Sequence, residues 1–169
     1  PQLSRTFAAA SFDGTVSVWE PTSSFSACDF ECSATIEGHE NEVKSVAWDA
    51  TGMMLATCGR DKTVWVWTTD DQAHEFDCAA VLRGHAGDVK SICWAPTAGG
   101  PLYSASYDDS VREWTAGAGT SGEWGCTATL EGHSSTVLDV VVSPPCSKRI
   151  SNAGYTIASC SDDSTVMFW

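Results

Sequence analysis

Histidine, hydroxyl and aspartate residues recur in this sequence in an order that could perform hydrolytic chemistry. A hydroxyl, an imidazole and a carboxylate held together can generate a nucleophile, as in Ser/His/Asp hydrolases. Each set also contains a tryptophan, and the three sets are His39, Thr57, Asp61 and Trp67; His85, Ser104, Asp108 and Trp114; and His133, Ser159, Asp163 and Trp169. An active site has no reason to appear three times at a near-constant interval, whereas a structural unit does. The recurrence therefore favours a structural role, and we predict no catalytic residue.

The structural interpretation accounts for each residue type in these tetrads. The aspartate can accept a hydrogen bond from the imidazole, the imidazole can bond the hydroxyl, and the hydroxyl can accept a bond from the indole N–H. All four buried polar groups are then satisfied. A partial repeat at the start of the chain has Ala9 where the hydroxyl belongs, so its network is expected to be incomplete.

The eight cysteines could hold a metal ion or cluster, but their spacing argues against it. No Cys-x-x-Cys occurs, and Cys28 and Cys32 form only a Cys-x-x-x-Cys pair. Cys32, Cys78 and Cys126 each lie seven residues before a tetrad histidine, so they occupy equivalent places in different repeats. Such places are too far apart for one ion with bonds of about 2.3 Å. We predict no metal site and no cofactor, and expect the thiols to pack as small hydrophobic side chains.

The repeats indicate the elements that must position these residues. Gly-His pairs end at residues 39, 85 and 133, and an Asp-x-(Thr/Ser)-Val-x-x-Trp motif ends at residues 19, 67, 114 and 169. Between these marks lie short alternating segments and glycine turns, which are typical of β-strands. The pattern resembles the WD40 repeat, in which each unit forms a four-stranded antiparallel blade of a β-propeller. The fold class is therefore expected to be all-β.

Counting the strands predicts one partial propeller across residues 1–169. Blade parts are expected at 7–36, 37–82, 83–130 and 131–169, which gives fourteen strands, or about three and a half four-stranded blades. Rings of this type close with roughly four to eight blades. We therefore expect the chain to be a fragment of a longer protein whose ring has about seven blades.

Composition excludes several classes of function. The 169 residues include 9 basic and 22 acidic side chains, and the net charge of −13 opposes binding to the phosphate backbone of nucleic acids. No run of about 18 apolar residues is present to span a membrane. The N-terminal Pro1-Gln2-Leu3 does not read as a secretory signal, so the cysteines are expected to be reduced thiols of an intracellular protein.

One face of the propeller is the expected place for function. The turns before each motif aspartate and the Gly-His loops should share one rim, and arginine and tyrosine on a rigid scaffold are frequent interface hot spots. The residues predicted to bind a partner are Arg60, Tyr107, Asp162, Phe12 and Asn41. Lys44 and Lys90, at equivalent places in two innermost strands, are expected to face the central channel.

Several stretches beyond the repeat marks resemble the WD40 subunit of the cytosolic iron–sulfur protein assembly (CIA) machinery. They include residues 29–48, 55–67 (with Gly-Arg-Asp-Lys at 59–62), 104–109, 129–133 and 158–163. The resemblance implies a non-catalytic docking scaffold that binds proteins of the CIA targeting complex and iron–sulfur apoprotein clients. It also implies a cytoplasmic location with the nucleus as a second compartment, no cluster held by the subunit itself, and a partner-binding role for Arg60.

Two alternatives stay open. A WD40 adaptor of another kind, such as a ubiquitin-ligase substrate receptor or a chromatin-complex subunit, would share the fold. A hydrolase or metal enzyme would use one of the tetrads or a Cys/His set.

The last two blades depart from the CIA pattern. The departures are Asp139, the Arg112-Glu113-Trp114 ending and an enlarged segment at 143–154.

Overall fold

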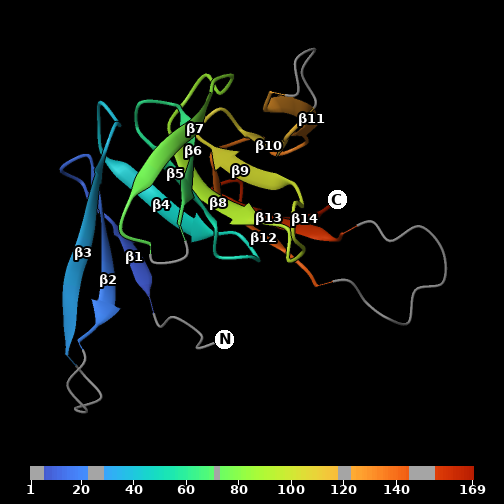
Figure 1. Cartoon of the computed structure of the whole chain (residues 1–169). Helices are drawn as coiled ribbons and strands as arrows, with labels where there is room; N and C mark the ends of the chain where they lie inside the picture. The colour runs from blue at the N-terminus through green and yellow to red at the C-terminus, as the bar shows by residue number, and fades with distance from the viewer. Residues whose placement is uncertain (1–5, 23–28, 71–72, 118–122, 145–154) are drawn as a thin grey trace.

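The computed structural model describes residues 6–22, 29–70, 73–117, 123–144 and 155–169. Fourteen β-strands account for the regular structure in these segments (Figure 1). In chain order they are β1 (Phe7–Ala10), β2 (Thr15–Pro21), β3 (Phe30–Glu37), β4 (Val43–Trp48), β5 (Met54–Gly59), β6 (Val64–Thr69), β7 (Phe76–Leu82), β8 (Val89–Trp94), β9 (Leu102–Ser106), β10 (Ser110–Thr115), β11 (Gly125–Glu131), β12 (Val137–Val142), β13 (Ile157–Ser161) and β14 (Val166–Phe168). None of the described segments forms a helix long and apolar enough to cross a membrane.

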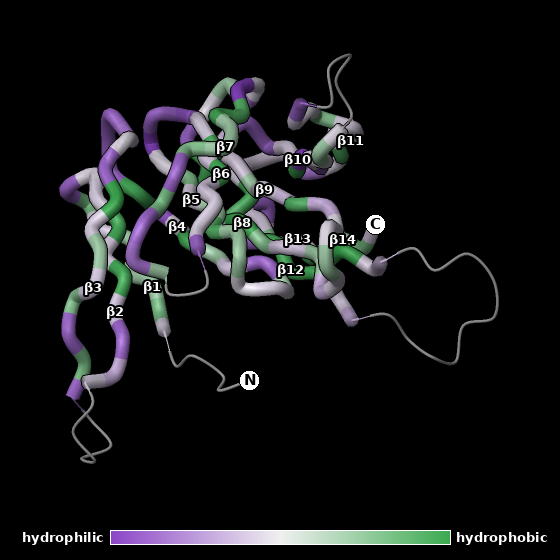
Figure 2. The backbone as a smooth tube through the Cα atoms, viewed as in Figure 1, coloured by the Kyte–Doolittle hydropathy of each residue, from purple (hydrophilic) through white to green (hydrophobic). Residues whose placement is uncertain are grey.

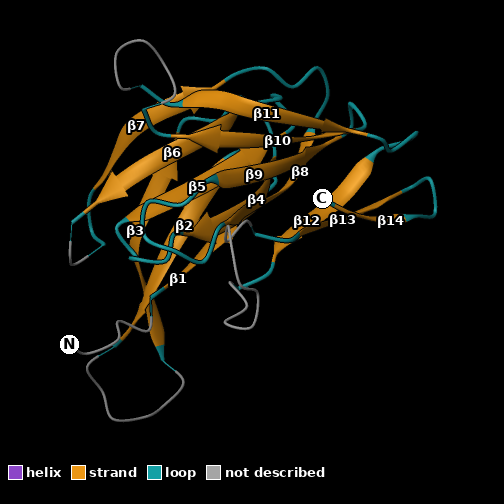
Figure 3. Ribbon diagram, turned by 90° about the vertical axis from the view of Figure 1, so that its right-hand side faces the viewer, coloured by secondary structure: helices purple, strands orange, loops and turns teal. Residues whose placement is uncertain are grey.

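The strands form four antiparallel sheets that follow one another along the chain. Their orders are β1-β2-β3, β4-β5-β6-β7, β8-β9-β10-β11 and β12-β13-β14. Neighbouring strands are consecutive in sequence, as expected when each connection is a hairpin. Figure 3 shows the sheets side by side, with the connecting loops at the strand ends. The predicted all-β propeller fold with antiparallel blades is confirmed.

Burial within each sheet follows the position of the strand. All five residues of β9 are buried, as are five of the six residues of β5, because neighbouring sheets cover both faces of these strands. Such strands read as runs of small and apolar residues rather than as alternating patterns. The outermost strands β3, β7 and β11 have at most one buried residue each. Figure 2 shows the same distribution, with hydrophobic residues concentrated in the central strands.

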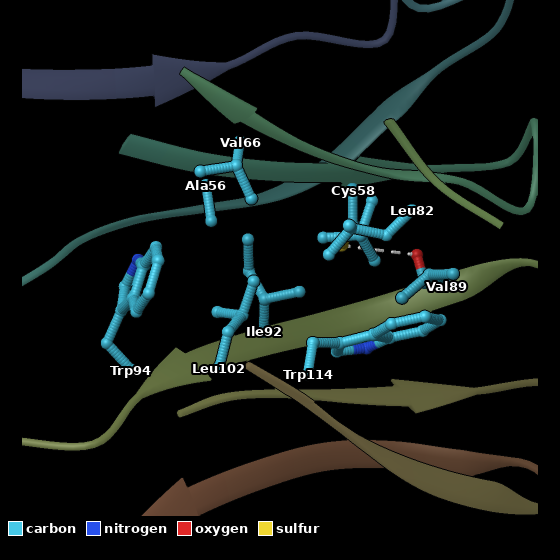
Figure 4. Close-up of a cluster of buried hydrophobic side chains, with 10 residues drawn as sticks. Ala56, Cys58, Val66, Leu82, Val89, Ile92, Trp94, Leu102 and Trp114 are labelled. Carbon is cyan, nitrogen blue, oxygen red and sulfur yellow. Dashed lines mark hydrogen bonds between the residues drawn. The ribbon is translucent and has the colours of Figure 1, made fainter. Parts of the chain in front are cut away.

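Neighbouring sheets pack through hydrophobic side chains. Ala56, Cys58 and Val66 of the second sheet share one buried cluster with Val89 and Ile92 of β8 (Figure 4). The Cys58 thiol also donates a hydrogen bond to the Val89 carbonyl at 3.5 Å. The innermost strands are neighbours as well, since β4 lies beside β8 and β8 lies beside β12. This packing gives successive sheets a fixed relation, which positions the loops at their ends.

A β-bulge lies opposite the motif tryptophan in each of the first three sheets. The tryptophans pair with exposed cysteines on the outermost strand, namely Trp19 with Cys32, Trp67 with Cys78 and Trp114 with Cys126. The expectation that these three thiols are packed inside was therefore wrong. The outermost strand lies beyond the cover of the neighbouring sheet, so its side chains at this position meet solvent. Cys58, on the central strand β5, is fully buried as expected.

Candidate functional site

The residues of the first tetrad lie within hydrogen-bonding distance of one another. His39 Nδ1 is 2.7 Å from Asp61 Oδ2, and His39 Nε2 is 2.8 Å from Thr57 Oγ1. The Trp67 indole N–H donates to the same Thr57 oxygen at 3.0 Å. The histidine belongs to the loop between β3 and β4, Thr57 to β5, Asp61 to the β5–β6 turn and Trp67 to β6. One network therefore joins a loop, a turn and two strands.

The other two tetrads repeat this geometry in the third and fourth sheets. The imidazole to carboxylate distance is 2.8 Å in both, from His85 to Asp108 and from His133 to Asp163. The imidazole to hydroxyl distances are 2.7 Å to Ser104 and 2.8 Å to Ser159. The indole N–H groups of Trp114 and Trp169 donate to these hydroxyls at 2.8 and 3.0 Å. The twelve residues named from the sequence are thus brought together as three equivalent corners.

The hydrogen-bond directions within a corner follow from the chemistry of its groups. An ionised carboxylate only accepts, so the proton on the histidine lies on Nδ1. The hydroxyl oxygen already accepts the indole N–H, so its own proton is directed to the histidine Nε2. Every polar group of the corner is then satisfied by a neutral imidazole beside a charged aspartate.

The electrostatics of the corners support this protonation state. Burial lowers the pKa of the His39 and His85 imidazoles, against the opposing effect of the neighbouring carboxylates. Burial by itself raises the pKa of Asp108, but hydrogen bonds from Ser110, the Ala86 backbone N–H and His85 outweigh it and hold the pKa at about 2. At neutral pH the His39 and His85 imidazoles are therefore uncharged and the Asp108 carboxylate is ionised.

The hydroxyl groups of the corners are closed off from solvent. Thr57 and Ser104 have 0% relative exposure and Ser159 has 2%. A nucleophile must reach a substrate carbonyl or phosphorus atom, and these oxygens are enclosed by the indole and imidazole rings. The arrangement ties loops to strands instead. Each aspartate also accepts the backbone N–H that follows the histidine, at Glu40, Ala86 and Ser134.

The first sheet departs from this arrangement in the manner expected from its sequence. Ala9 occupies the position of the hydroxyl on β1, and the Trp19 indole N–H donates to Ser17 Oγ at 2.8 Å instead. The Asp13 carboxylate bonds Thr15 within its own turn. This turn is held without a histidine.

Exposed side chains stand at the turns, directly before the motif aspartates. Arg60, Tyr107 and Asp162 are each the first residue after a central strand, and their backbone N–H groups donate to Glu42, Asp88 and Thr136 at 2.8 to 3.0 Å. Phe12 occupies the equivalent place in the first sheet. Phe12 is 72% exposed and Tyr107 60%, while the Arg60 side chain is 55% exposed. Asn41 is exposed in the loop that carries His39. These five residues, with Lys44 and Lys90, are called the rim below.

Two lysines of the innermost strands join the rim through aromatic rings. Lys44 Nζ lies 4.1 Å from the centroid of the Phe12 ring and 2.9 Å from Glu42 Oε2. Lys90 Nζ lies 5.3 Å from the Tyr107 ring centroid and 3.6 Å from an Asp88 oxygen. These aromatic partners were not expected from the sequence. The repeated acid-x-Lys spacing at 42–44 and 88–90 was an available signal for the two ion pairs, since residues two apart in an extended chain share a face, but it carries no signal for the aromatic rings.

The described residues contain no group of three or more histidine, cysteine, aspartate and glutamate side chains arranged to hold a metal ion. His74 Nε2 lies 3.1 Å from Glu20 Oε1, and this contact joins the β6–β7 loop of the second sheet to the first sheet.

Two features noted in the sequence lie outside the described residues. They are Cys28, half of the Cys-x-x-x-Cys pair, and most of the enlarged segment, at 145–154. Asp139, one of the departures from the CIA pattern, accepts a hydrogen bond from Ser91 on β8.

Comparison with known proteins agrees with this architecture. The WD40 family (WD domain, G-beta repeat) matches residues 30–68, 76–115 and 124–169. A probable cytosolic Fe-S cluster assembly factor of Schizosaccharomyces japonicus is 57% identical over 56 residues, 33% of this chain and 8% of that protein. The probable cytosolic iron-sulfur protein assembly protein 1 of Eremothecium gossypii is 57% identical over 56 residues, 33% of this chain and 17% of that protein. A protein of the same name from Vanderwaltozyma polyspora is 49% identical over 75 residues, 36% and 21% of the two chains.

The chain spans less than a quarter of the length of these relatives. The family match, by contrast, covers most of the chain. Each matched segment begins at the outermost strand of one sheet, ends with the third strand of the next and contains one complete corner. On this evidence the chain belongs to the WD40 repeat family.

Proposed function

We propose that this chain is a non-catalytic docking scaffold of the cytosolic iron–sulfur cluster assembly machinery. Its partners are proteins of the CIA targeting complex and iron–sulfur apoprotein clients, and it acts in the cytoplasm with the nucleus as a second compartment. The assignment to this pathway rests on sequence identities of 49 to 57%, over about a third of the chain, with relatives named for cytosolic Fe-S assembly. Neither nucleic acid nor a membrane surface is a partner in this proposal, in keeping with the net charge of −13.

The rim supports docking rather than chemistry. Phe12, Tyr107 and Arg60 are exposed side chains of types that dominate interface hot spots. Arg60 and Tyr107 stand on turns that the corner aspartates fasten to the neighbouring loops, so little conformational entropy is lost there when a partner binds. A rigid base with exposed aromatic and guanidinium groups is what a docking surface requires.

The corners support the non-catalytic part of the proposal. Three equivalent sets with enclosed hydroxyl groups are better explained as structural ties than as three active sites. The scaffold needs no cofactor of its own in this proposal, and clusters pass between other proteins that it holds together.

The proposal is tested by affinity purification of the tagged chain from cells, comparing the wild type with Arg60→Glu. We expect iron–sulfur assembly proteins and client apoproteins with the wild type and their loss with the variant. Arg83→Glu, the same charge change at an exposed arginine just beyond β7, is the matched control and should retain them. Recovery of only cullin or histone machinery would identify another kind of WD40 adaptor and reject the proposal.

A further inference from the structure

Arg112 is a charged residue at a position that is uncharged in the other three sheets. It lies on β10 opposite Ser104, the hydroxyl residue of the corner in the third sheet. The residues at the equivalent position of the other sheets are Ser17, Trp65 and Met167. The Arg112 guanidinium lies against Gly84, since a Cβ atom added to that glycine would be 2.8 Å from Nη1. The glycine therefore leaves the space in which this partly buried cation is held.

The Arg112 guanidinium has hydrogen-bond donors without acceptors. In the part of the chain that the structure describes, no carboxylate forms an ion pair with it. Its Nε atom is buried and has no hydrogen-bond partner there. The Nη1 atom lies 3.9 Å from the sulfur of Cys126, which is exposed on β11. An unpaired guanidinium beside an exposed thiol favours an anionic group bound next to that sulfur.

Cys32 provides a comparison within the same molecule. Cys32 and Cys126 are both exposed, and each lies on an outermost strand opposite a motif tryptophan. Each thiol donates to the carbonyl two residues further along, at 3.4 Å from Cys32 and 3.3 Å from Cys126. Each sulfur also lies 3.8 to 3.9 Å from the hydroxyl of the threonine three residues further along. The residue opposite that threonine is Ser17 in the first sheet and Arg112 in the third, so the guanidinium distinguishes two otherwise similar thiols.

We propose that Cys126 and Arg112 form a thiol–disulfide exchange site for small disulfides that carry carboxylate groups, a class represented by glutathione disulfide. The Cys126 thiol gives its proton to water and its sulfur attacks one sulfur of the disulfide. The S–S bond of the reagent breaks, and the second half leaves as a thiolate that takes a proton from water. Cys126 is oxidised to a mixed disulfide and half of the reagent is reduced to a thiol, so the reaction needs no other oxidant.

Arg112 has two roles in this proposal. Its charge stabilises the negative charge that three sulfur atoms share during exchange. The guanidinium then pairs with a carboxylate of the half that stays bound, which supplies the acceptor that it lacks in the described residues. The site is on an outermost strand, away from the turns that carry the rim, and it does not depend on the proposed function.

The test compares an anionic with a cationic disulfide on the folded chain. Native protein is treated with glutathione disulfide or with cystamine near neutral pH and quenched with acid, and mass spectrometry of proteolytic fragments gives the initial rate at each cysteine. The ratio of the two rates at one cysteine cancels its exposure and measures the charge around it. We expect this ratio to be about fivefold higher at Cys126 than at Cys32, and the difference to shrink in about 1 M salt.

Variants of Arg112 test whether the guanidinium is the cause. Arg112→Gln should lower the ratio at Cys126 to the value at Cys32, and Arg112→Lys should retain most of it because the positive charge is kept. Lys62→Asn removes a positive charge from an exposed turn and should leave both ratios unchanged. Thermal unfolding followed by circular dichroism shows whether each variant is folded.

The wild-type comparison decides the proposal even if the glutamine variant does not fold. Equal ratios at Cys126 and Cys32 in the wild type reject it. A folded Arg112→Gln protein that keeps the high ratio at Cys126 rejects it as well.

Discussion

The Asp61 carboxylate oxygen that lies 2.7 Å from His39 Nδ1 also accepts the Glu40 backbone N–H at 3.2 Å. One side chain of the β5–β6 turn thus fastens the loop that enters β4. The opposite oxygen bonds the backbone and hydroxyl of Thr63. The corner therefore holds the β5–β6 turn at a fixed distance from the β3–β4 loop. Arg60, which directly precedes Asp61, is fixed in place by the same contacts.

Replacing Asp61 by alanine should lower the free energy of unfolding by about 1 to 3 kcal/mol, because the His39 N–H is left without an acceptor in a buried place. Chemical denaturation followed by tryptophan fluorescence measures this change. Asp77→Ala, at an exposed aspartate of β7, is the control and should change stability by less than about 0.5 kcal/mol. Equal stability of the Asp61 variant and the wild type would contradict the structural role.

Replacing Thr57 by valine tests the hydroxyl of the same corner at nearly constant volume. The change leaves both the His39 Nε2 and the Trp67 N–H without their partner, and we expect a cost of about 1 to 3 kcal/mol. Thr57→Ser keeps the hydroxyl and removes one methyl group, so its cost should be near 1 kcal/mol. A serine variant less stable than the valine variant would show that packing, not hydrogen bonding, decides the position.

Stability should fall as the pH is lowered below about 6.5. The folded state lowers the pKa of His39 and His85 through burial, so the unfolded chain takes up protons first, near the ordinary histidine pKa of 6.5. A second loss should follow below pH 4 and extend to about pH 2, where Asp108 is finally protonated. Denaturation midpoints across this range measure both steps. His74→Gln, at an exposed histidine, should leave the upper step in place.

Cysteine labelling should separate the outermost strands from the central one. We expect Cys32 and Cys126, which are exposed, to react with a maleimide in the native protein. Cys78 should react more slowly, because partial burial raises the pKa of its thiol. Cys58 is fully buried, with its pKa raised by desolvation, and should react only after unfolding. Mass spectrometry of proteolytic fragments over time gives the order, and early labelling of Cys58 would contradict the packing of β5 against β8.

Much of the fold could be predicted because its marks are local. The Asp-x-(Thr/Ser)-Val-x-x-Trp motif contains both the turn that bonds Thr63 to Asp61 and the strand that ends near Trp67. The environment of Cys78 could not be predicted in this way. Asp77, Cys78 and Ala79 are all exposed, because this part of the outermost strand lies beyond the cover of the neighbouring sheet, and the periodicity within one strand does not contain where that cover ends.

The rim was only partly accessible to sequence reasoning for a related reason. The repeat places Arg60 and Tyr107 at equivalent turns, so their shared edge follows from the period. The contact between Lys44 and Phe12 depends on how the first two sheets pack against each other. The residue spacing within one repeat therefore cannot predict it. That the Trp94 indole N–H bonds the Ala47 carbonyl of the preceding sheet likewise becomes visible only when one sheet is compared with the next.

The bulges opposite Trp19, Trp67 and Trp114 affect how readily the protein aggregates at high concentration. They interrupt the ladders between β3, β7 and β11 and their neighbours, and these three strands are the outer margins of their sheets. A bulge sharpens the local twist and spoils the flat, regular row of amide groups on which a foreign strand could grow. The outer margins of these three sheets are therefore poor templates for aggregation.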